Sequence, residues 1–470
     1  MTTKWDRNGT ETLPDRPSKP PGSTWTDEQW EAIRLRGSDI LVAAAAGSGK
    51  TAVLVERIIR RISDERDPVD VDRLLVATFT NAAAGEMRER IRDALEKRLI
   101  EQPESDHLRK QIALIHRASI TTLHSFCLDV IRRHHQRIRL DPSFRIANVI
   151  ETELMRQDIL SDLLEEQYDQ SGEDSPFWQL ADAYGGERGD DALFRLIGRL
   201  YDYSRSHPWP DHWLTGTASA FEQASSALSP AGSRGENETD RWKRVLMADV
   251  RLELQGTASL LEEALRLCER PGGPAPYGSN LKDDLAQVHL AASAANRSWS
   301  ELYDAFAQTA FGKLNACRGS DVDKSLQERV KQLRDRAKKQ INDMKEELFE
   351  RTPEQYAAEM AETAPLVLKL AEIVIQFGER YRQAKLAKGL VDFSDLEHYC
   401  LDILRHPDSL PGTLIPSDAA EQYREQFVEI LLDEYQDTNT VQEAIVALIA
   451  RPAPGNRFMV GDVKQSIVRP

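Results

Sequence analysis

DILVAAAAGSGKT, residues 39–51, is the stretch that decides the expected fold. After Asp39, residues 40–46 are a continuous apolar run of the kind that forms a buried parallel strand. An amphipathic helix should follow, because TAVLVERIIRRI (51–62) places its valines and isoleucines along one face. A buried strand, a glycine-containing turn and a helix in this order predict a loop that binds phosphate with its backbone N–H groups and the helix N-terminus.

The same alternation continues beyond this stretch. LLVATF, from Leu74, is typical of a second buried strand, and Asn81 can cap a helix whose apolar stripe begins with Met87. Buried strands separated by helices predict an α/β fold, a doubly wound parallel sheet with helices on both faces. Buried-strand character returns at 427–433 and at 457–460, so a long segment should interrupt the sheet.

The interrupting segment, residues 151–383, has a mostly helical pattern cut by loops rich in proline, glycine and serine. Within it, residues 321–351 alternate basic and acidic side chains, which is typical of a solvated helix face. We therefore expect a chain with distinct parts. They are a flexible tail at 1–23, the first part of the sheet domain at 24–150, a helical inserted domain at 151–383, and the second part of the sheet domain at 384–470.

The composition limits the class of protein. The 470 residues include 61 Lys and Arg against 77 Asp and Glu, a formal net charge of −16, and 40% are hydrophobic. No apolar run approaches the roughly 18 residues that a spanning helix needs, and the N-terminus lacks a signal-peptide core, so we expect a cytoplasmic protein without a membrane segment. The cysteines are too scattered for a metal cluster or a disulfide framework, which favours buried free thiols. The acidic balance argues against a surface covered with DNA-binding residues, but it is compatible with a local basic groove.

Residues 43–51 carry the groups that would hold a nucleoside triphosphate. Gly49, Lys50 and Thr51 meet the phosphate-loop pattern, but Ala44 stands where the general pattern has its first glycine. Lys50 would reach the β- and γ-phosphate oxygens, and the Thr51 hydroxyl would ligate Mg²⁺. The alternative is a glycine turn that caps a helix with Lys and Thr at its start. The flanking strand and helix favour the phosphate loop.

A phosphate loop needs an acidic partner on a neighbouring strand, and LLDEYQDT at 431–438 supplies one. Asp433 would hold Mg²⁺, and Glu434 would orient and deprotonate the attacking water. The alternative is an ordinary strand end whose acids cap the next helix. A second polar strand end, VGDVKQS at 460–466, favours the catalytic interpretation. Because Lys50 and Asp433 must meet at one phosphate, the long segment between them has to leave the sheet as separate domain material.

An ordered set of motifs resembles that of the UvrD/Rep-type superfamily 1 helicases: WTDEQ, AAAAGSGKT, TFTNAAAGEMRERI, ITTLHSFC, LVDFSDLEHYCLDIL, LLDEYQDT and VGDVKQSI. The similarity runs from Trp25 to Ile467. Within the superfamily, DILVAAAAGSGKTAVLVER and DFSDLEHYC are most similar to the A subunits of the AddAB helicase–nucleases of bacterial recombinational repair. The resemblance implies a RecA-like domain interrupted by a helical insertion, and a 3′-to-5′ DNA helicase that uses ATP and Mg²⁺. It also implies double-strand break repair beside a partner B subunit, with single-stranded DNA and duplex ends as substrates.

The resemblance assigns roles in the nucleotide site residue by residue. Gln29 matches the glutamine that reads adenine, although it could instead be the capping-box partner of Thr26, and one side chain could hardly do both. The two acids of DEYQ match the Mg²⁺ ligand and the catalytic base, and Gln436 matches a residue near the nucleotide. Gln465 matches the glutamine that senses the γ-phosphate and couples it to DNA. The triphosphate cradle comprises Ala44, Ala45, Ala46, Gly47, Ser48, Gly49, Lys50 and Thr51.

The resemblance also assigns DNA contacts, from TFTN (78–81) and TTLHSF (121–126). Asn81 is, however, also a sufficient helix cap, and a lone histidine beside a helix start is often structural. In DFSDLE, Ser394 and Glu397 are expected to form a capping box, so that Asp392 and Asp395 need no further function. The candidate DNA contacts are Phe79, Thr80, Asn81, Thr122, His124, Phe126 and Arg469.

Two departures from the family pattern concern the end of the sequence. The family continues with a second RecA-like domain, whose arginines complete the ATP site, and the A subunits also have a nuclease domain; neither has a counterpart here. Where the family has an aromatic pair around an arginine, Val468 and Pro470 flank Arg469. We therefore expect a truncated chain that binds ATP, hydrolyses it slowly and holds single-stranded DNA weakly. The alternatives are a catalytically silent nucleotide- or DNA-binding remnant and another class of phosphate-loop ATPase, and DEYQDT and GDVKQS argue against the latter.

Overall fold

The chain divides into two compact units in the computed structural model. The structure describes Lys19 and residues 22–45, 47–64, 66–138, 140–185, 189–227, 240–317, 322–462 and 464. Unit 1 comprises residues 1–169, 191–213 and 374–470, and unit 2 comprises residues 170–190 and 214–373.

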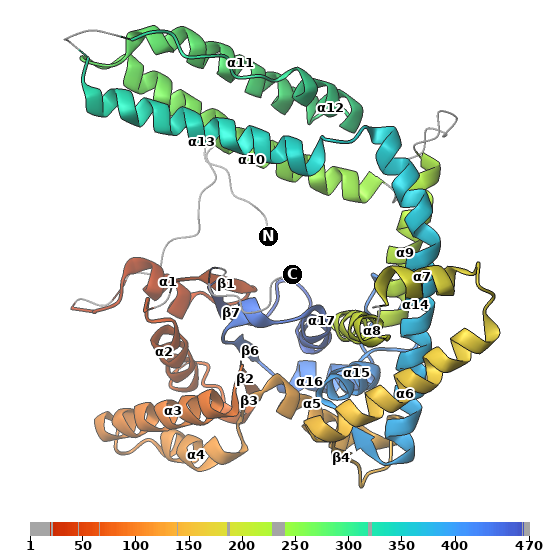
Figure 1. The fold of residues 1–470 in the computed structure, drawn as a ribbon. Helices are drawn as coiled ribbons and strands as arrows, with labels where there is room; N and C mark the ends of the chain where they lie inside the picture. The colour runs from red at the N-terminus through yellow and green to blue at the C-terminus, as the bar shows by residue number, and fades with distance from the viewer. Residues whose placement is uncertain are drawn as a thin grey trace. The chain divides into compact units, whose positions relative to one another are not determined.

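Within the described residues, unit 1 is built on a five-stranded parallel sheet with the strand order β1-β7-β6-β2-β3. The two strands from the end of the chain lie between β1 and β2 (Figure 1), so residues far apart in sequence become neighbours, as Val42 beside Val460 and Leu75 beside Ile430. The parallel sheet predicted from the apolar runs is thereby confirmed. Its strands are β1 (Ile40–Ala43), β2 (Leu74–Thr78), β3 (Ser119–Thr122), β6 (Glu429–Leu432) and β7 (Arg457–Gly461).

Helices cover both faces of this sheet. Side chains alternate along a strand, and on β2 Leu74 and Val76 join one apolar core while Leu75 and Ala77 join another. The first core contains α1 (Asp27–Arg34), α2 (Lys50–Ile62), α3 (Asn81–Glu101) and α4 (Asp106–Leu114). The second contains α5 (Leu123–His134), α15 (Phe393–Leu404), α16 (Asp418–Gln426) and α17 (Thr440–Ile449).

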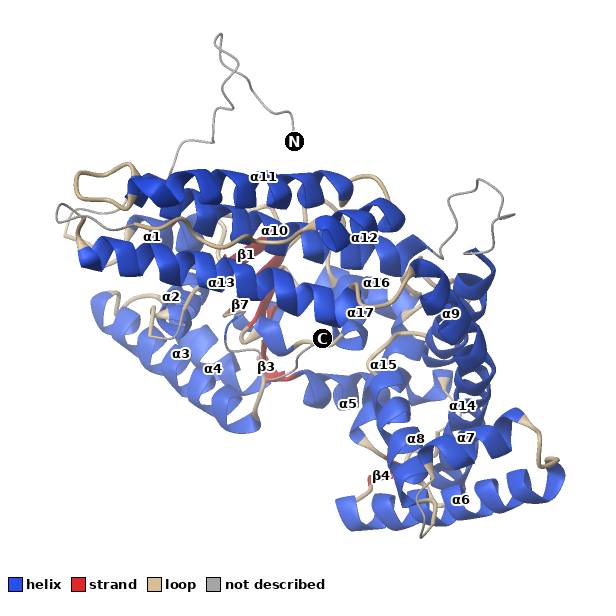
Figure 2. Cartoon of the chain, turned by 45° about the horizontal axis from the view of Figure 1, so that its top comes forward, coloured by secondary structure: helices blue, strands red, loops and turns tan. Residues whose placement is uncertain are grey.

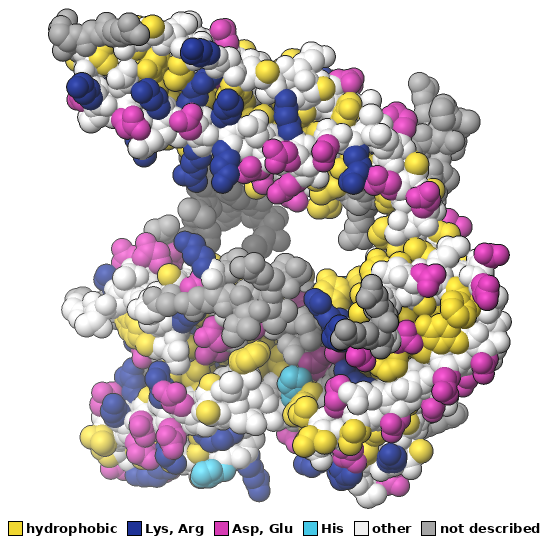
Figure 3. All heavy atoms as spheres, viewed as in Figure 1, with side chains coloured by type: hydrophobic (Ala, Val, Ile, Leu, Met, Phe, Trp, Pro, Cys, Tyr) yellow, Lys and Arg dark blue, Asp and Glu magenta, His cyan; other side chains and the backbone are white. Residues whose placement is uncertain are grey.

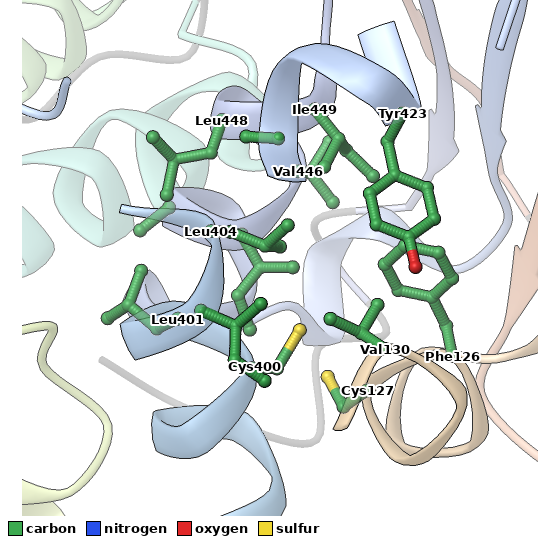
Figure 4. Packing of buried hydrophobic residues seen from close by; sticks show 14 of the residues in the cluster. Phe126, Cys127, Val130, Cys400, Leu401, Leu404, Tyr423, Val446, Leu448 and Ile449 are labelled. Carbon is green, nitrogen blue, oxygen red and sulfur yellow. The ribbon is translucent and has the colours of Figure 1, made fainter. Parts of the chain in front are cut away.

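The second core of unit 1 brings two cysteines together. Cys127 on α5 and Cys400 on α15 point toward one another among leucine, valine and aromatic side chains (Figure 4). Both are free thiols, and a hydrogen bond between them, together with burial, raises the pKa of Cys127 well above its usual value. These thiols therefore behave as small apolar side chains in the core.

Two helix starts correct the expected caps. The cap of α3 is Thr80, whose Oγ1 accepts a hydrogen bond from Ala83 N–H at 3.1 Å, and not Asn81. The capping box of α15 joins Asp392 and Asp395, so the expected box of Ser394 and Glu397 was wrong. In both cases the N-cap is the residue whose backbone is still extended at the end of the preceding strand or loop.

Within the described residues of unit 2, the regular secondary-structure elements are all helices, joined by loops (Figure 2). Its core lies among α10, α11, α12 and α13, and a buried ion pair joins Arg334 on α13 to Asp284 on α11 at 2.6 Å. On the face shown in Figure 3, Lys and Arg lie among Asp and Glu along this unit, as expected for a solvated surface. Its helices are α7 (Pro176–Tyr184), α10 (Asp240–Cys268), α11 (Gly278–Ala294), α12 (Trp299–Gln308) and α13 (Lys324–Leu348), together with most of α9 (Pro210–Ala227) and the first part of α14 (Pro353–Ala387).

The helical inserted domain was expected to span residues 151–383, but unit 2 comprises only residues 170–190 and 214–373. Two helices from the expected range, α6 (Val149–Gln170) and α8 (Asp191–Ser204), belong to unit 1, as does the last part of α14. Unit 1 also contains a small second sheet of two parallel strands, β4 (Arg145–Ile146) and β5 (Leu390–Val391), that the sequence did not predict. Among the described residues, no helix combines the length and apolar character needed to cross a membrane.

Candidate nucleotide site and its neighbours

The loop between β1 and α2 combines two left-handed glycines with a helix N-terminus. Gly47 and Gly49 have φ of 74° and 83°, a region in which a side chain is strained. A Cβ on Gly49 would also lie 3.3 Å from Gln29 Nε2. Ala44 N–H donates to Gly461 O at 3.0 Å, so the loop leaves β1 while still paired to β7. The two glycines let the backbone turn directly into the first turn of α2, which begins at Lys50.

Two buried polar atoms at this loop have no hydrogen-bond partner among the described residues. They are the Lys50 Nζ and the Ser48 Oγ. The Lys50 side chain is only 10% exposed, and its Nζ lies 3.6 Å from Glu434 Oε2, too far for a hydrogen bond. A buried ammonium without a hydrogen bond is costly, so this arrangement suits an anion that would complete it.

Gln29 contacts this loop while also capping α1. Its Oε1 accepts from Thr26 N–H at 3.0 Å, and its backbone N–H donates to Thr26 Oγ1 at 3.2 Å, which closes the capping box. Its Nε2 at the same time donates to Ser48 O at 2.9 Å. An amide has two N–H groups and two lone pairs, so one of each is left for a ligand. The cap and a place beside the loop are therefore compatible in one side chain, contrary to our expectation that it could hardly serve two purposes.

Asp433 and Glu434 follow β6 at the same edge of the sheet. Asp433 N–H still pairs with Ala77 O of β2 at 2.9 Å. Glu434 has φ 54° and ψ 44°, the one left-handed conformation of a non-glycine residue in the part of the chain that the structure describes. Burial, and next the charge of Glu434, raise the pKa of Asp433 above its usual value. A bound cation would reverse that effect, which fits Asp433 to a metal-ligand role.

Gln436 fixes the Glu434 side chain relative to β7. Its Nε2 donates to Glu434 Oε2 at 2.8 Å, and its Oε1 accepts from Asp462 N–H at 2.9 Å. The approach is so close that a Cβ on Gly461 would lie 2.7 Å from Gln436 Oε1. The sequence placed Gln436 near the nucleotide, and the structure shows it as the link between two strand ends.

Of these groups, Asp433, Glu434 and Gln436 line a cavity of about 390 Å³ at the carboxyl edge of the sheet, together with Thr51 of the phosphate loop. Arg90, on α3, also lines it and was missed by the sequence analysis. Its position could have been found, because Arg90 lies one and two helical turns after Glu86 and Ala83 in the TFTNAAAGEMRERI motif and all three line the cavity. The lining residues are Thr51, Thr78, Phe79, Thr80, Ala83, Glu86, Met87, Arg90, Asp433, Glu434, Gln436 and Asp437.

Some of the candidate DNA contacts already have a role at a helix start, and the two candidate phenylalanines differ in their exposure. Thr80 and Thr122 are N-caps, of α3 and α5, and Asn81 Oδ1 lies 3.5 Å from the Thr122 hydroxyl. Phe79 is 56% exposed and free to meet a ligand, whereas Phe126 is buried in the core and therefore cannot.

His124 has a defined protein partner. Its Nε2 lies 3.0 Å from Glu397 Oε1, and its ring meets Phe393 edge-on at 5.4 Å. Phe393 is 57% exposed although it is a large aromatic residue, and the sequence analysis gave it no role. It was missed because no periodic pattern marks a single exposed aromatic at a helix start.

Three candidate residues lie outside the described part of the chain. They are Ala46, Gln465 and Arg469.

The sequence matches the UvrD/REP helicase N-terminal domain over residues 25–469. The chain belongs to the UvrD/Rep helicase family. The resemblance inferred from the motifs is thus confirmed.

Curated relatives of this UvrD/Rep chain are named as the A subunit of an ATP-dependent helicase/nuclease. The proteins of Geobacillus kaustophilus and Bacillus licheniformis are each 49% identical over 453 residues, which is 96% of this chain and 36% of each relative. The protein of Heliobacterium modesticaldum is 46% identical over 462 residues, 96% of this chain and 33% of the relative. The chain therefore spans about a third of the length of these UvrD/Rep relatives.

Proposed function

We propose that this chain binds ATP with Mg²⁺ at the carboxyl edge of its sheet and hydrolyses it slowly by itself, as the ATP-binding part of a 3′-to-5′ DNA helicase subunit. In this proposal unit 1 is a RecA-like phosphate-loop domain, unit 2 is an insertion in it, and the chain forms the N-terminal part of a helicase–nuclease subunit. That protein would act beside a B subunit on duplex ends in double-strand break repair. The observation that carries the proposal is the buried Lys50 ammonium, which has no hydrogen-bond partner in the described part of the chain and lies beside two left-handed glycines, facing Glu434.

The residues at this edge have the chemistry that phosphate transfer to water requires. The Lys50 ammonium and the N–H groups at the start of α2 would hold the phosphate oxygens. The Thr51 hydroxyl and Asp433 would hold Mg²⁺, which usually takes one or two protein ligands together with phosphate oxygens and water. Bound Mg²⁺ offsets the charge that develops on the phosphate. Glu434, oriented by Gln436, would accept the proton of the attacking water.

A surface for single-stranded DNA lies next to this site in the same proposal. Phe79 and Phe393 are exposed aromatics, and His124 stands edge-on to Phe393. Bases stack on exposed aromatic side chains with about 1–3 kcal/mol per base and little sequence preference. The family resemblance suggests DNA contacts at Phe79 and His124, and the exposure of Phe393 supports including it in the proposed surface.

The phosphate loop is tested by calorimetric titration of ATP and Mg²⁺ into the 470-residue chain and its Lys50→Ala variant. A hydrogen bond to a charged group contributes about 1.5–3 kcal/mol, so the variant should bind about ten- to a hundredfold more weakly. Lys110→Ala is the matched control, because Lys110 lies on the surface and pairs with Asp70. Equal affinity of the Lys50→Ala and parent chains would reject the site.

Hydrolysis is tested separately with Glu434→Gln. Loss of a general base typically lowers the rate about 10²–10⁴-fold, while the affinity for nucleotide should stay within several-fold of the parent. A parent chain that binds ATP but shows no turnover above that of Glu434→Gln would be the catalytically silent alternative.

A further inference from the structure

Glu397, on α15, is a buried carboxylate that accepts hydrogen bonds from two different segments. His124 Nε2 lies 3.0 Å from its Oε1, Gln442 Nε2 donates to the same oxygen at 2.6 Å, and Asn439 Nδ2 donates to Oε2 at 3.1 Å. Burial raises the pKa of this carboxyl, but the hydrogen bonds from His124 and Gln442 outweigh burial and leave the pKa below its usual value. An ionised carboxylate only accepts, so His124 must carry its proton on Nε2.

The donors belong to the two segments that the proposed function needs to connect. His124 lies in the first turn of α5, next to the exposed aromatics that would meet DNA. Asn439 caps α17 and accepts from Gln442 N–H at 2.8 Å, directly after the short turn that carries Glu434. Glu397 therefore ties the start of α5 to the segment that leaves the catalytic edge.

A second, smaller cavity of about 100 Å³ adjoins the first one. His124 and Gln442 line it together with Asp433 and Glu434. Thr78, Phe79, Asp433, Glu434 and Asp437 line both cavities. A movement of the His124 side chain would therefore change the shape of a cavity that Glu434 also lines.

We propose that Glu397 is a positioning residue that transmits DNA binding at His124 to the segment carrying Glu434. A base or phosphate that draws His124 away leaves the shared oxygen of Glu397 with one donor fewer in a buried place. The carboxylate then rearranges with Gln442 and Asn439, and α17 with them. This inference rests on the proposed function, and it adds a residue that neither the phosphate loop nor the aromatic surface contains.

The test measures the coupling between nucleotide and DNA on the full 470-residue chain. The probe is a fluorescent 16-nucleotide oligothymidylate, titrated with and without a non-hydrolysable ATP analogue and Mg²⁺. Couplings between two ligand sites are commonly about 5–150-fold in affinity. Glu397→Gln keeps the size of the side chain but replaces one carboxylate oxygen by an NH2 group, which must face at least one of the three donors. It should therefore reduce the coupling at least about threefold toward unity. Its affinity for the analogue alone should stay within about twofold.

Two further variants separate transmission from a general loss of structure. Asp402→Asn, on the same helix, removes one negative charge that pairs with Arg405, and it should keep the parent coupling. Glu397→Gln combined with Gln442→Glu exchanges the two partners across the 2.6 Å bond and should restore part of the coupling. Undiminished coupling in Glu397→Gln, or no coupling in a parent chain that binds both ligands, would overturn this inference alone. A parent chain that does not bind the analogue would overturn the proposed function and this inference with it.

Discussion

Glu434 combines a strained backbone with a tightly held side chain. A left-handed conformation costs a residue with a Cβ about 1–3 kcal/mol, and it persists only where the surroundings enforce it. Here the Glu434 N–H donates to Asp433 Oδ1 at 3.1 Å, and Gln436 holds the carboxylate. Strain that the surroundings maintain in this way is common where a catalytic group must be held in one orientation.

His398, on α15 beside Glu397, gives a prediction about pH. Burial, and next the charge of Arg205, lower the pKa of His398 to about 3, while its Nε2 lies 2.9 Å from Arg205 O. The unfolded chain takes up this proton below about pH 6.5, but the folded chain does not until about pH 3. In that window the unfolded state binds more protons, so the free energy of unfolding falls as pH falls, by about 1.4 kcal/mol per pH unit for this group.

His398→Gln removes this titration and keeps an N–H group that can reach Arg205 O. Between pH 7 and pH 5, the free energy of unfolding should fall by about 2 kcal/mol less in the variant than in the parent, as measured by urea titration. His116→Gln, at an exposed position, is the control and should show a much smaller change. Parallel pH profiles for His398→Gln and the parent would contradict the buried neutral histidine.

The elements that the sequence predicted are those with an unbroken apolar run. LLVAT, EILL and RFMVG form β2, β6 and β7, which are almost wholly buried, and such strands need no polar face. ILVA forms β1 as predicted, but its expected burial was wrong, because β1 lies at the edge of the sheet and its Leu41 is 63% exposed. β3 was missed because SITT is short and polar at three of its four positions, with alternate residues buried. The two-residue strands β4 and β5 give no pattern at all.

The caps were misassigned because several residues near each helix start have the right side chain. In DFSDLE, both Asp392 and Ser394 have an acid three residues later. Tertiary contacts decide between them, since Asp392 is extended after β5 and pairs with the buried Lys385 at 2.7 Å. Ser394 instead accepts a hydrogen bond from Arg205 Nε at 2.7 Å. A sequence shows the candidates, but not which residue the preceding strand leaves extended.

The two candidate caps of α15 should differ in stability. Asp392→Ala removes the cap, worth about 1 kcal/mol, and also leaves the buried Lys385 ammonium with Asp395 as its one carboxylate partner. Breaking a buried pair costs about 3–5 kcal/mol, so Asp392→Ala should destabilise by several kcal/mol. Ser394→Ala loses one hydrogen bond and should cost about 1 kcal/mol. Urea unfolding of both variants checks the order, and equal losses would argue against the Asp392 cap.

At the scale of the whole chain, the requirement that the phosphate loop and its acidic partner meet predicted that the late strands join the first sheet. It did not predict where the two compact units divide. Lys50 and Asp433 had to meet, and β6 and β7 do lie between β1 and β2. The limits of the helical material were not predictable in the same way. The helices α6 and α8 have apolar stripes like those of unit 2, and a stripe shows that a face is buried without showing which core covers it.

The separation of the cores gives the last prediction. Unit 2 has its own apolar cluster and, within it, the ion pair of Arg334 and Asp284, whose side chains are 6% and 2% exposed. Arg334→Ala leaves Asp284 buried without its cation, which should cost about 3–5 kcal/mol. Because the nucleotide-site residues belong to unit 1, calorimetry should show a lower unfolding temperature for one transition, while the affinity for ATP stays unchanged.

The double variant Arg334→Met with Asp284→Leu tests the cause of that loss. Replacing both members of a buried pair by apolar residues of similar size is often neutral or stabilising by about 1–4 kcal/mol. The double variant should therefore recover the transition that Arg334→Ala lowers, since no charge is left unpaired among the leucines and alanines of this core. If Arg334→Ala weakened ATP binding, or shifted a single transition of the whole chain, the two units would have to unfold as one. In that case the division of the core into separate clusters would not describe the energetics of the chain.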